Sequence, residues 1–363
     1  MKVGILTFHR AHNFGAMLQC YALQEYLTTK GLNVEVIDYR QPYIETLYSK
    51  YSLQDLEKHN LKRFIKGLFI LTRYTRNRRC STFNKFAKRF IKTSSKEYTN
   101  SIFGYDCIII GSDQLWNRNL TNGIDYIYFG DFEHEPTTNV FAYSVSLGHK
   151  EFNKTDFEYA LFCINTKLNY VSVRETQLKN YLSDICNKDI LVTLDPTLLL
   201  NKEDWLKISC NIRYKKYVLI YPLIDIEETI NAGIQLAKSK GLNYYIIDGV
   251  AKWFPIKHHL RFVNPSEFIS LIFNANYIVT SSFHGTVFSI ILNKEFFSFV
   301  KSDTHNYRIE SLLSNVDLSK RLINEYSHFS SVDTPIHYEK VNRIIHNLRM
   351  ESEVYLQDSI NRL

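Results

Sequence analysis

Residues 3–38 read VGILTFHRAHNFGAMLQCYALQEYLTTKGLNVEVID, and this stretch decides the fold. Val3–Phe8 is a short apolar run with the length of a buried strand. Gly15–Lys30 repeats its apolar residues at helical spacing, and Gly31 is a typical helix stop. Asn33–Asp38 then predicts a second strand. Strand, helix and strand in this order form a βαβ unit, which predicts a parallel sheet covered by helices.

The same alternation continues in two series. The first series predicts further strands at Tyr105–Ile110, Asn139–Val145, Tyr170–Val173 and Ile190–Leu194. The second series predicts strands at Tyr217–Leu223, Tyr244–Ile247, Tyr277–Thr280 and Phe296–Val300. Two such series predict an α/β protein of two Rossmann-like, doubly wound domains that face each other across a cleft.

We expect the first domain to span residues 1–204 and the second to span 205–336. The polar, strand-poor stretch from Trp205 to Lys216 marks the junction. Residues 337–363 predict a helix, which we expect to pack back on the first domain.

Composition is typical of a soluble globular protein, with 45% hydrophobic and 22% charged residues among 363. The apolar stretch before His9 is too short for a signal peptide, and runs such as Val287–Leu292 fall far below the roughly 20 residues of a transmembrane helix. The six cysteines are scattered without a CxxC pair, which is typical of reduced thiols. These features predict a cytoplasmic protein without a zinc site.

Positive charge is concentrated in one segment of the chain, whose net charge is +7. Lys62–Lys92 contains eleven Lys and Arg residues and no Asp or Glu. Phe83, Phe86 and Phe90 recur at helical spacing, so residues 61–92 predict basic amphipathic helices. They could form a solvated face, or a surface for anionic lipid or a pyrophosphate-linked acceptor. Nucleic acid is the weakest alternative, because no recognised binding motif accompanies the charge.

The first polar loop, His9–Gly15, leads into a helix N-terminus. Free N–H groups and the helix dipole at such a position suit an anion or sugar hydroxyls. The loop lacks the GxGxxG fingerprint of dinucleotide enzymes. Asp38, at the end of the second strand, is therefore only a weak candidate for binding a nicotinamide ribose.

Two further loops follow strands of the first series. In Gly111–Asn117, Asp113 is either a base toward a sugar hydroxyl or the cap of a following helix. In Ser172–Glu175, the guanidinium of Arg174 is a planar fork suited to carboxylate or phosphate. Taken alone, an arginine at this position more often forms a surface ion pair, here with Glu175 or another acid.

The fourth loop, Thr280–Thr286, lies between a buried strand and an apolar helix. Its small hydroxyl residues and Gly285 allow a ligand to approach a helix N-terminus, and His284 could reach that ligand. A lone histidine is more often structural, but this setting favours a functional one. Arg308 opens a later helix and could supply another anion contact.

Taken together, these loops resemble the polysaccharide pyruvyl transferase family over nearly the whole chain. The resemblance rests on five motifs in order, which are Leu6-Thr7-Phe8 with Asn13-Phe14-Gly15-Ala16, Gly111-Ser112-Asp113-Gln114 with Trp116-Asn117, Ser172-Val173-Arg174-Glu175, Asp195-Pro196-Thr197, and Ser281 with His284-Gly285. It implies a GT-B-like fold, with the acceptor on the first domain and the donor on the second.

The resemblance also implies the chemistry: an enolpyruvyl unit moves from phosphoenolpyruvate onto two hydroxyls of a sugar, forming a ketal and releasing phosphate. It implies Arg174, His284 and Asp113 as catalytic residues. The implied donor contacts are Arg174, Ser281, Ser282, His284, Gly285 and Arg308. The implied acceptor contacts are His12, Asn13, Phe14, Gln114, Trp116 and Asn117.

One departure from the family pattern stands at Ser282. Many members have an arginine there, two residues before the histidine, and Arg308 is the nearest candidate substitute. No cofactor is implied beyond phosphoenolpyruvate as co-substrate, and no Asp/Glu cluster suggests a metal. The acceptor is expected to be a lipid-linked or polymeric surface glycan, used at the inner face of the membrane.

Two other functions stay open. A GT-B glycosyltransferase using a nucleotide sugar would need an acid that binds ribose in the second domain, where this chain has Ser289 and Asn293. A non-catalytic sugar-binding protein would tolerate loss of Arg174 and His284, and both are present.

Overall fold

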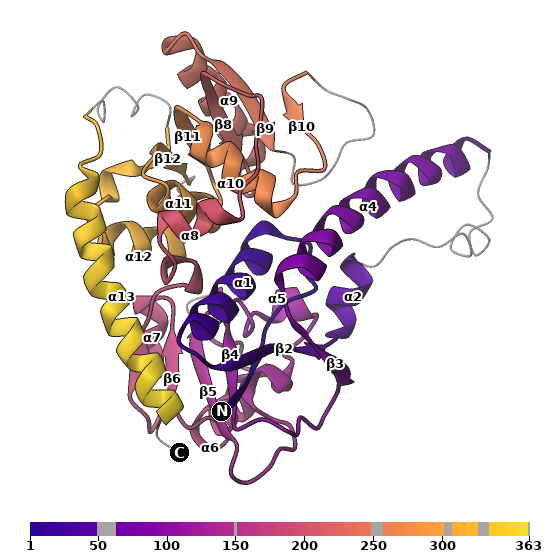
Figure 1. Cartoon of the computed structure of the whole chain (residues 1–363), viewed down its shortest axis with the longest axis vertical. Helices are drawn as coiled ribbons and strands as arrows, with labels where there is room; N and C mark the ends of the chain where they lie inside the picture. Colours follow the sequence, from indigo (N-terminus) through magenta and orange to yellow (C-terminus); the bar gives the residue numbers. More distant parts are fainter. Residues whose placement is uncertain (49–62, 149–150, 248–256, 301–306, 326–333, 362–363) are drawn as a thin grey trace.

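The computed structural model describes the chain apart from residues 49–62, 149–150, 248–256, 301–306, 326–333 and 362–363; in helix α4, side chains are described from Tyr74 onward. Two parallel sheets form the framework (Figure 1). The first sheet has the order β3-β2-β1-β4-β5-β6-β7. Its strands are β1 Lys2–Leu6, β2 Asn33–Tyr39, β3 Thr93–Tyr98, β4 Cys107–Asp113, β5 Asn139–Val145, β6 Val171–Val173 and β7 Ile190–Val192.

The second sheet repeats this winding in the order β10-β9-β8-β11-β12-β13. Its strands are β8 Tyr217–Tyr221, β9 Asn243–Ile247, β10 His259–Leu260, β11 Tyr277–Thr280, β12 Glu295–Phe299 and β13 Leu322–Ile323. The described strand pairs are parallel throughout. The predicted fold class, two doubly wound α/β domains, is confirmed.

Helices fill the connections between the strands. They are α1 Phe14–Thr29, α2 Pro42–Tyr48, α4 Arg63–Phe90, α5 Arg118–Thr121, α6 Phe157–Thr166, α7 Thr176–Ser183, α8 Lys202–Lys207, α9 Ile226–Ser239, α10 Pro265–Asn274, α11 Phe283–Ile291, α12 Tyr307–Asn315 and α13 Tyr338–Asn361. Short 3-10 turns lie at Tyr126–Phe129, Pro196–Leu198 and Ser319–Arg321.

The prediction of separate basic helices within residues 61–92 is wrong, because Arg63–Phe90 forms one helix, α4. No proline interrupts this segment, so nothing in the backbone forces it to end. Figure 1 shows α4 leaving the body of the molecule. Three strands, β3, β10 and β13, were not predicted from the sequence. They are polar or very short strands at the edges of the two sheets.

Winding of this kind places a crevice where the strand order reverses, between β1 and β4 in the first sheet and between β8 and β11 in the second. Ligands of doubly wound sheets bind at the carboxyl ends of the strands beside this point. The loops that follow β1 and β4 are His9–Asn13 and the stretch after Asp113. The loop after β11 contains Ser281 and Ser282. The fold therefore brings three of the candidate loops to two facing crevices.

Helix α1 joins the two halves. It is buried on nearly every side, as expected of a helix enclosed between a sheet and a second domain. The ring of Phe14 stacks on Phe268 of α10 with centroids 4.4 Å apart. Farther along α1, Tyr21 contacts Trp205, which in turn packs edge-on against Phe288 of α11. These aromatic contacts form a hydrophobic core that is continuous across the two sheets.

Helix α13 runs along both halves of the molecule (Figure 1). Near its start, the Tyr338 hydroxyl lies 3.3 Å from the carbonyl oxygen of Ser289 in α11. Near its end, the Tyr355 hydroxyl donates to the carbonyl of Ala142 in β5 at 2.7 Å. The domain bounds drawn from the sequence stay a prediction.

Truncating Phe14 should measure the strength of this junction. We expect Phe14→Ala to lower the free energy of unfolding by about 3–5 kcal/mol, because it opens a cavity among buried aromatic rings. Phe103→Ala is the matched control, since that ring is 47% exposed. Denaturant unfolding of both variants checks this, and equal stabilities of the two would contradict a packed junction at Phe14.

Candidate active site

Charged side chains from both halves meet between the carboxyl edge of the first sheet and helices α11 and α12. Arg174 follows β6 and Asp195 follows β7 in the first sheet. His284 lies in the first turn of α11, and Arg308 lies in the first turn of α12. The topology therefore brings together groups from two distant parts of the sequence.

Arg174 is the most enclosed of these cations, with a side chain that is 3% exposed. Its Nη2 donates to the Oγ of Ser112 at 2.6 Å and lies 2.8 Å from Oδ2 of Asp195. The guanidinium also sits 4.9 Å from the centre of the Phe283 ring. The alternative, a surface ion pair with Glu175 or another acid, is right about an acid partner, since Arg174 pairs with Asp195, but wrong about the surface, because both side chains are buried. Glu175 is not that partner: it is itself buried and accepts a hydrogen bond from Ser146.

The guanidinium of Arg174 retains unused hydrogen-bonding capacity. Its Nε and Nη1 are buried, and neither has a hydrogen-bond partner within the described chain. The nearest acid to Nη1 is Asp113, whose Oδ1 is 3.9 Å away. Buried polar groups are normally satisfied in folded proteins. Two free N–H directions on a buried guanidinium therefore indicate a place for an anionic ligand.

Asp195 is the anion of the cluster, and its side chain has no exposed surface. Its Oδ1 accepts hydrogen bonds from the backbone N–H of Thr197 at 2.9 Å and from the Thr197 hydroxyl at 2.5 Å. Burial alone would raise the pKa of this carboxyl. The charges of Arg174 and His284 outweigh burial and hold that pKa well below its usual range.

In the sequence, Asp195 stands in one of the family motifs, and the local pattern does not indicate a role for it. The signal that could have found it is its place after a predicted strand, followed by Pro196 and Thr197, where an aspartate side chain commonly folds back on its own backbone.

His284 is held between the two halves of the molecule. Its Nε2 lies 3.5 Å from Oδ2 of Asp195. On its other side the imidazole rests against Gly15 in the first turn of α1: a Cβ added to Gly15 would lie 2.0 Å from Nδ1 of His284. Gly15 therefore allows the imidazole of His284 to pack closely against α1.

The remaining residues of the fourth loop shape the backbone around His284. The Ser281 hydroxyl accepts hydrogen bonds from the backbone N–H groups of Leu223 and Ile224. Ser282 is the N-cap of α11 and accepts from Gly285 N–H. A Cβ on Gly285 would lie 2.3 Å from Oγ1 of Thr280, so this glycine allows helix and strand to approach. Direct contact of these three residues with the donor stays a prediction.

Arg308 supplies a second guanidinium beside the same aromatic ring, 5.5 Å from the Phe283 centroid. Burial lowers the pKa of Arg308, and the charge of Arg174 acts in the same direction. With its amide oxygen turned toward α12, Gln114 accepts a hydrogen bond from Nη1 of Arg308 at 2.7 Å.

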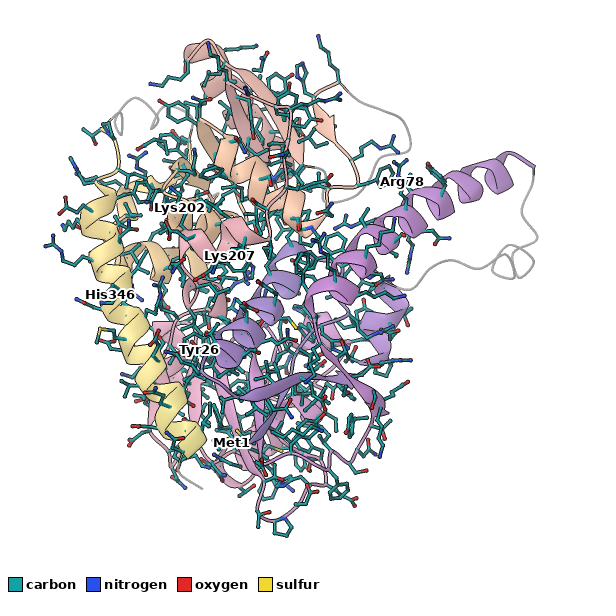
Figure 2. The ribbon with its side chains drawn as sticks, in the orientation of Figure 1. Met1, Tyr26, Arg78, Lys202, Lys207 and His346 are labelled. Carbon is teal, nitrogen blue, oxygen red and sulfur yellow. The ribbon has the colours of Figure 1, made fainter. Side chains whose placement is uncertain are left out.

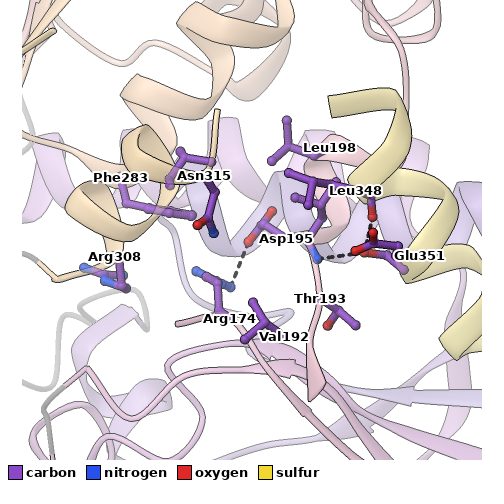
Figure 3. A pocket seen from close by; sticks show the side chains of 13 residues that line it. Arg174, Val192, Thr193, Asp195, Leu198, Phe283, Arg308, Asn315, Leu348 and Glu351 are labelled. Carbon is purple, nitrogen blue, oxygen red and sulfur yellow. Dashed lines mark hydrogen bonds and ion pairs between the residues drawn. The ribbon is translucent and has the colours of Figure 1, made fainter. Parts of the chain in front are cut away.

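A small cavity opens between these groups (Figure 3). Its volume is about 40 Å³, room for a few water molecules. Its polar lining comprises Arg174, Asp195 and Arg308 with Thr193, Asn315, Glu351 and Ser352. The cavity is thus rich in charge and framed by both guanidiniums.

Asp113 lies at the end of β4 with a left-handed backbone, φ 89°. Its Oδ1 accepts a hydrogen bond from the N–H of Gln114. The alternative that Asp113 caps a helix is wrong, because the next helix, α5, begins at Arg118 and is capped by Asn117. The carboxylate instead faces Arg174, so its role as a base stays a prediction.

The six expected acceptor contacts fall into two groups. Phe14 belongs to the aromatic junction, and Trp116 is 1% exposed and stacks on Phe129. Asn13 and Asn117 are helix N-caps. Both aromatic side chains are buried, and direct contact of these four residues with a sugar stays a prediction.

His12 and Gln114 remain closer to the crevice. His12 Nε2 is 3.0 Å from Oδ1 of Asn84 in α4, while its Nδ1 is buried without a hydrogen-bond partner in the described chain. Burial lowers the pKa of His12 to about 4, so its imidazole is neutral at physiological pH. A neutral ring with a free nitrogen suits a hydroxyl group better than an anion.

Asp38, the weak candidate for a nicotinamide ribose, is engaged within the protein. It pairs with His9 at 3.0 Å and with Arg40 at 2.8 Å. In the part of the chain that the structure describes, there is no group of His, Cys, Asp and Glu that could hold a metal ion. Among the described helices, none is long and apolar enough to cross a membrane.

The contact between Gly15 and His284 can be tested by enlarging the glycine. We expect Gly15→Ala to lower the free energy of unfolding by about 1–3 kcal/mol, because the new methyl group overlaps the imidazole. The same change in a His284→Ala background should cost much less, since the obstructing ring is gone. Denaturant unfolding of the two single variants and the double variant measures this, and an equal cost in both backgrounds would contradict the contact.

Comparison with solved structures bears on the fold. UDP-GlcNAc 2-epimerase from Neisseria meningitidis, solved with UDP-GlcNAc, is 14% identical, with a TM-score of 0.52; the match covers 98% of this chain and 99% of that one. The heptosyltransferase WaaC of E. coli, solved with ADP, is 10% identical, with a TM-score of 0.41, covering 96% of this chain and all of that one (100%). The first likeness supports the GT-B-like arrangement and is too distant to indicate an activity.

Comparison by sequence gives the family. No curated protein matches this chain. The profile of the polysaccharide pyruvyl transferase family matches residues 13–303, which include the end of the first candidate loop and the whole of the other three, and leave Arg308 just outside. The chain belongs to the polysaccharide pyruvyl transferase family.

Proposed function

We propose that this protein transfers an enolpyruvyl unit from phosphoenolpyruvate onto two hydroxyls of a sugar, forming a ketal and releasing phosphate. The observation that carries the proposal is the pair of guanidiniums, buried Arg174 and half-buried Arg308, beside one Phe283 ring. Phosphoenolpyruvate carries two anionic groups, a carboxylate and a phosphate. Guanidiniums bind both groups through paired hydrogen bonds.

Arg308 offers a physical reason why Ser282 can replace the family arginine. Ser282 caps α11, whereas Arg308 brings a positive charge to the same ring from α12. We therefore assign Arg308 the phosphate contact that the missing arginine would make. Because the cavity holds only a few water molecules, donor entry would require the two halves or the side chains of α12 to move apart.

The reaction begins with a proton transfer to the methylene carbon of the donor, and we assign this transfer to His284 in the first turn of α11. The resulting oxocarbenium-like centre is attacked by a sugar hydroxyl, whose proton passes to Asp113. The carbon–oxygen bond to phosphate then breaks, and the two arginines stabilise the leaving charge. A second hydroxyl closes the ketal and releases the last proton.

Incubation with phosphoenolpyruvate and a panel of lipid-linked oligosaccharides tests this function. Release of inorganic phosphate together with the added mass on one acceptor would support it. Turnover of a nucleotide sugar, with no reaction of phosphoenolpyruvate, would favour a glycosyltransferase. Against that rival, Ser289 is no acid, and its hydroxyl is used within the helix, donating to the carbonyl of Gly285.

Two variants separate binding from chemistry. Arg174→Ala should raise the donor KM strongly, and Arg174→Lys should rescue poorly, because an ammonium cannot form two parallel hydrogen bonds. His284→Ala should lower kcat by roughly 10²–10⁴-fold with less effect on donor affinity. Steady-state kinetics beside calorimetric donor titration measures both. Arg343→Ala, an exposed change on α13, is the control. Near-normal kcat in His284→Ala would rule the histidine out as the acid.

We also propose that α4 contacts an anionic membrane surface, where a lipid-linked acceptor would lie. Some of its charges serve the fold: Arg79 donates to the carbonyl of His12, and Arg78 lies 4.6 Å from the Phe262 ring centre, on the part of α4 seen in Figure 2. Lys85 and Lys88 are exposed. These two lysines are therefore available for a surface.

Vesicle binding tests the membrane contact. Binding to vesicles containing anionic phospholipid should weaken as salt rises, because screening shortens the range of charge attraction. Replacing Lys85 and Lys88 by glutamate should weaken it further at low salt. Equal binding to neutral and anionic vesicles, or no binding to either, would contradict the membrane contact and indicate that the charges of α4 form a solvated face.

A further inference from the structure

Asp195 is a carboxylate at a place where the proposed donor is a di-anion. It lines the same small cavity as the two arginines. A negative charge there would repel the carboxylate and the phosphate of the donor, so Asp195 is poorly suited to bind it. Burying a charge is also costly unless it is paired and hydrogen-bonded. Its presence therefore calls for a role toward neighbouring groups.

The two oxygens of Asp195 are used differently. Oδ1 is fixed to its own turn by both the N–H and the hydroxyl of Thr197. Oδ2 faces away from that turn, 2.8 Å from Nη2 of Arg174 and 3.5 Å from Nε2 of His284. One oxygen anchors the side chain, and the other presents a fixed negative charge to two nitrogens.

Those two nitrogens belong to different halves of the molecule. Arg174 extends from the end of β6 in the first sheet, and His284 extends from α11 beside the second sheet. The imidazole packs against Gly15 on the side that carries Nδ1 and faces Asp195 through Nε2. Asp195 is the described carboxylate within 4.0 Å of both.

We propose that Asp195 is the positioning residue of this site: its carboxylate holds the guanidinium of Arg174 and the imidazole of His284 in register across the domain junction. The inference rests on the proposed function, in which Arg174 binds the donor and His284 delivers the proton. It adds that neither group keeps its working position without this buried charge. Thr197 acts one step further out, because it fixes the carboxylate.

Asp195→Asn tests the role with little change of shape. The amide oxygen can keep both bonds to Thr197, while the amide nitrogen puts N–H groups against the two cations. We expect donor KM to rise and kcat to fall, each by about 10–100-fold, the range typical when a group that orients a ligand-binding side chain is removed. Asp189→Asn is the matched control, since Asp189 is an exposed aspartate at the start of β7, and it should leave both constants unchanged.

A double-mutant cycle separates positioning from a general effect on folding. If Asp195 acts through His284, then Asp195→Asn should lower kcat far less in a His284→Ala background than in the wild type. Likewise, it should barely raise donor KM once Arg174 is alanine. Thr197→Val, which removes one bond to Oδ1 and keeps the charge, should give a smaller effect in the same direction, and it covers the case that Asp195→Asn fails to fold.

The outcomes are distinct. If the wild type is active but both Asp195→Asn and Thr197→Val keep kcat and donor KM within about twofold of the wild-type values, the inference is wrong and the proposed function still stands. Additive losses in the double variants would overturn it as well, because a residue that only stabilises the fold costs the same in every background. A wild type that neither binds phosphoenolpyruvate nor releases phosphate from it would overturn the proposed function and this inference together.

Discussion

The buried carboxylate of Asp195, facing a guanidinium from one half of the molecule and an imidazole from the other, is the constraint around which the site is built. A carboxylate with no exposed surface stays ionised only if nearby positive charge offsets the cost of removing it from water. Here that charge comes from Arg174 and His284. The two groups that lower the pKa of Asp195 come from different halves of the molecule. Asp195 therefore stays ionised only while the two halves lie close together.

The surrounding packing keeps that approach close. The stacked rings of Phe14 and Phe268 bring the N-terminus of α1 onto the second half of the molecule. Gly15, the next residue, leaves room for the imidazole of His284. Phe14 and Gly15, neighbours at the start of α1, therefore have different roles. Phe14 packs against an apolar ring, and Gly15 leaves space for the imidazole. A larger residue at either position would change the separation of the charged groups.

Much of the fold could be predicted from the sequence, because strands such as Asn139–Val145 are apolar runs with clear helical segments between them. Edge strands were missed for a physical reason: β3 reads TSSKEY, and a strand with a solvated face carries little hydrophobic signal. The basic amphipathic helices expected within residues 61–92 are a single helix, α4, because the segment contains no proline that would end it. The resemblance to the pyruvyl transferase family, by contrast, was confirmed over residues 13–303.

The site was harder to predict than the fold. Arg174, His284 and Arg308 could be singled out because cations at strand ends and helix starts are readable from sequence order. Asp195 could not, since its importance comes from two partners far away in the chain. For Phe14 and Trp116 the family resemblance implies sugar contacts, which stay a prediction, and the sequence did not show that other rings enclose both side chains. Burial of a loop side chain is decided by tertiary packing, which the local pattern does not contain.

A crystal structure of the protein with phosphoenolpyruvate would test the central claim most directly. The account predicts the donor beside the Phe283 ring, with its carboxylate and phosphate between the guanidiniums of Arg174 and Arg308 and its methylene carbon toward His284. Asp195 should remain on Thr197, out of contact with the donor. Donor density elsewhere in the molecule, or bound to neither arginine, would contradict the account.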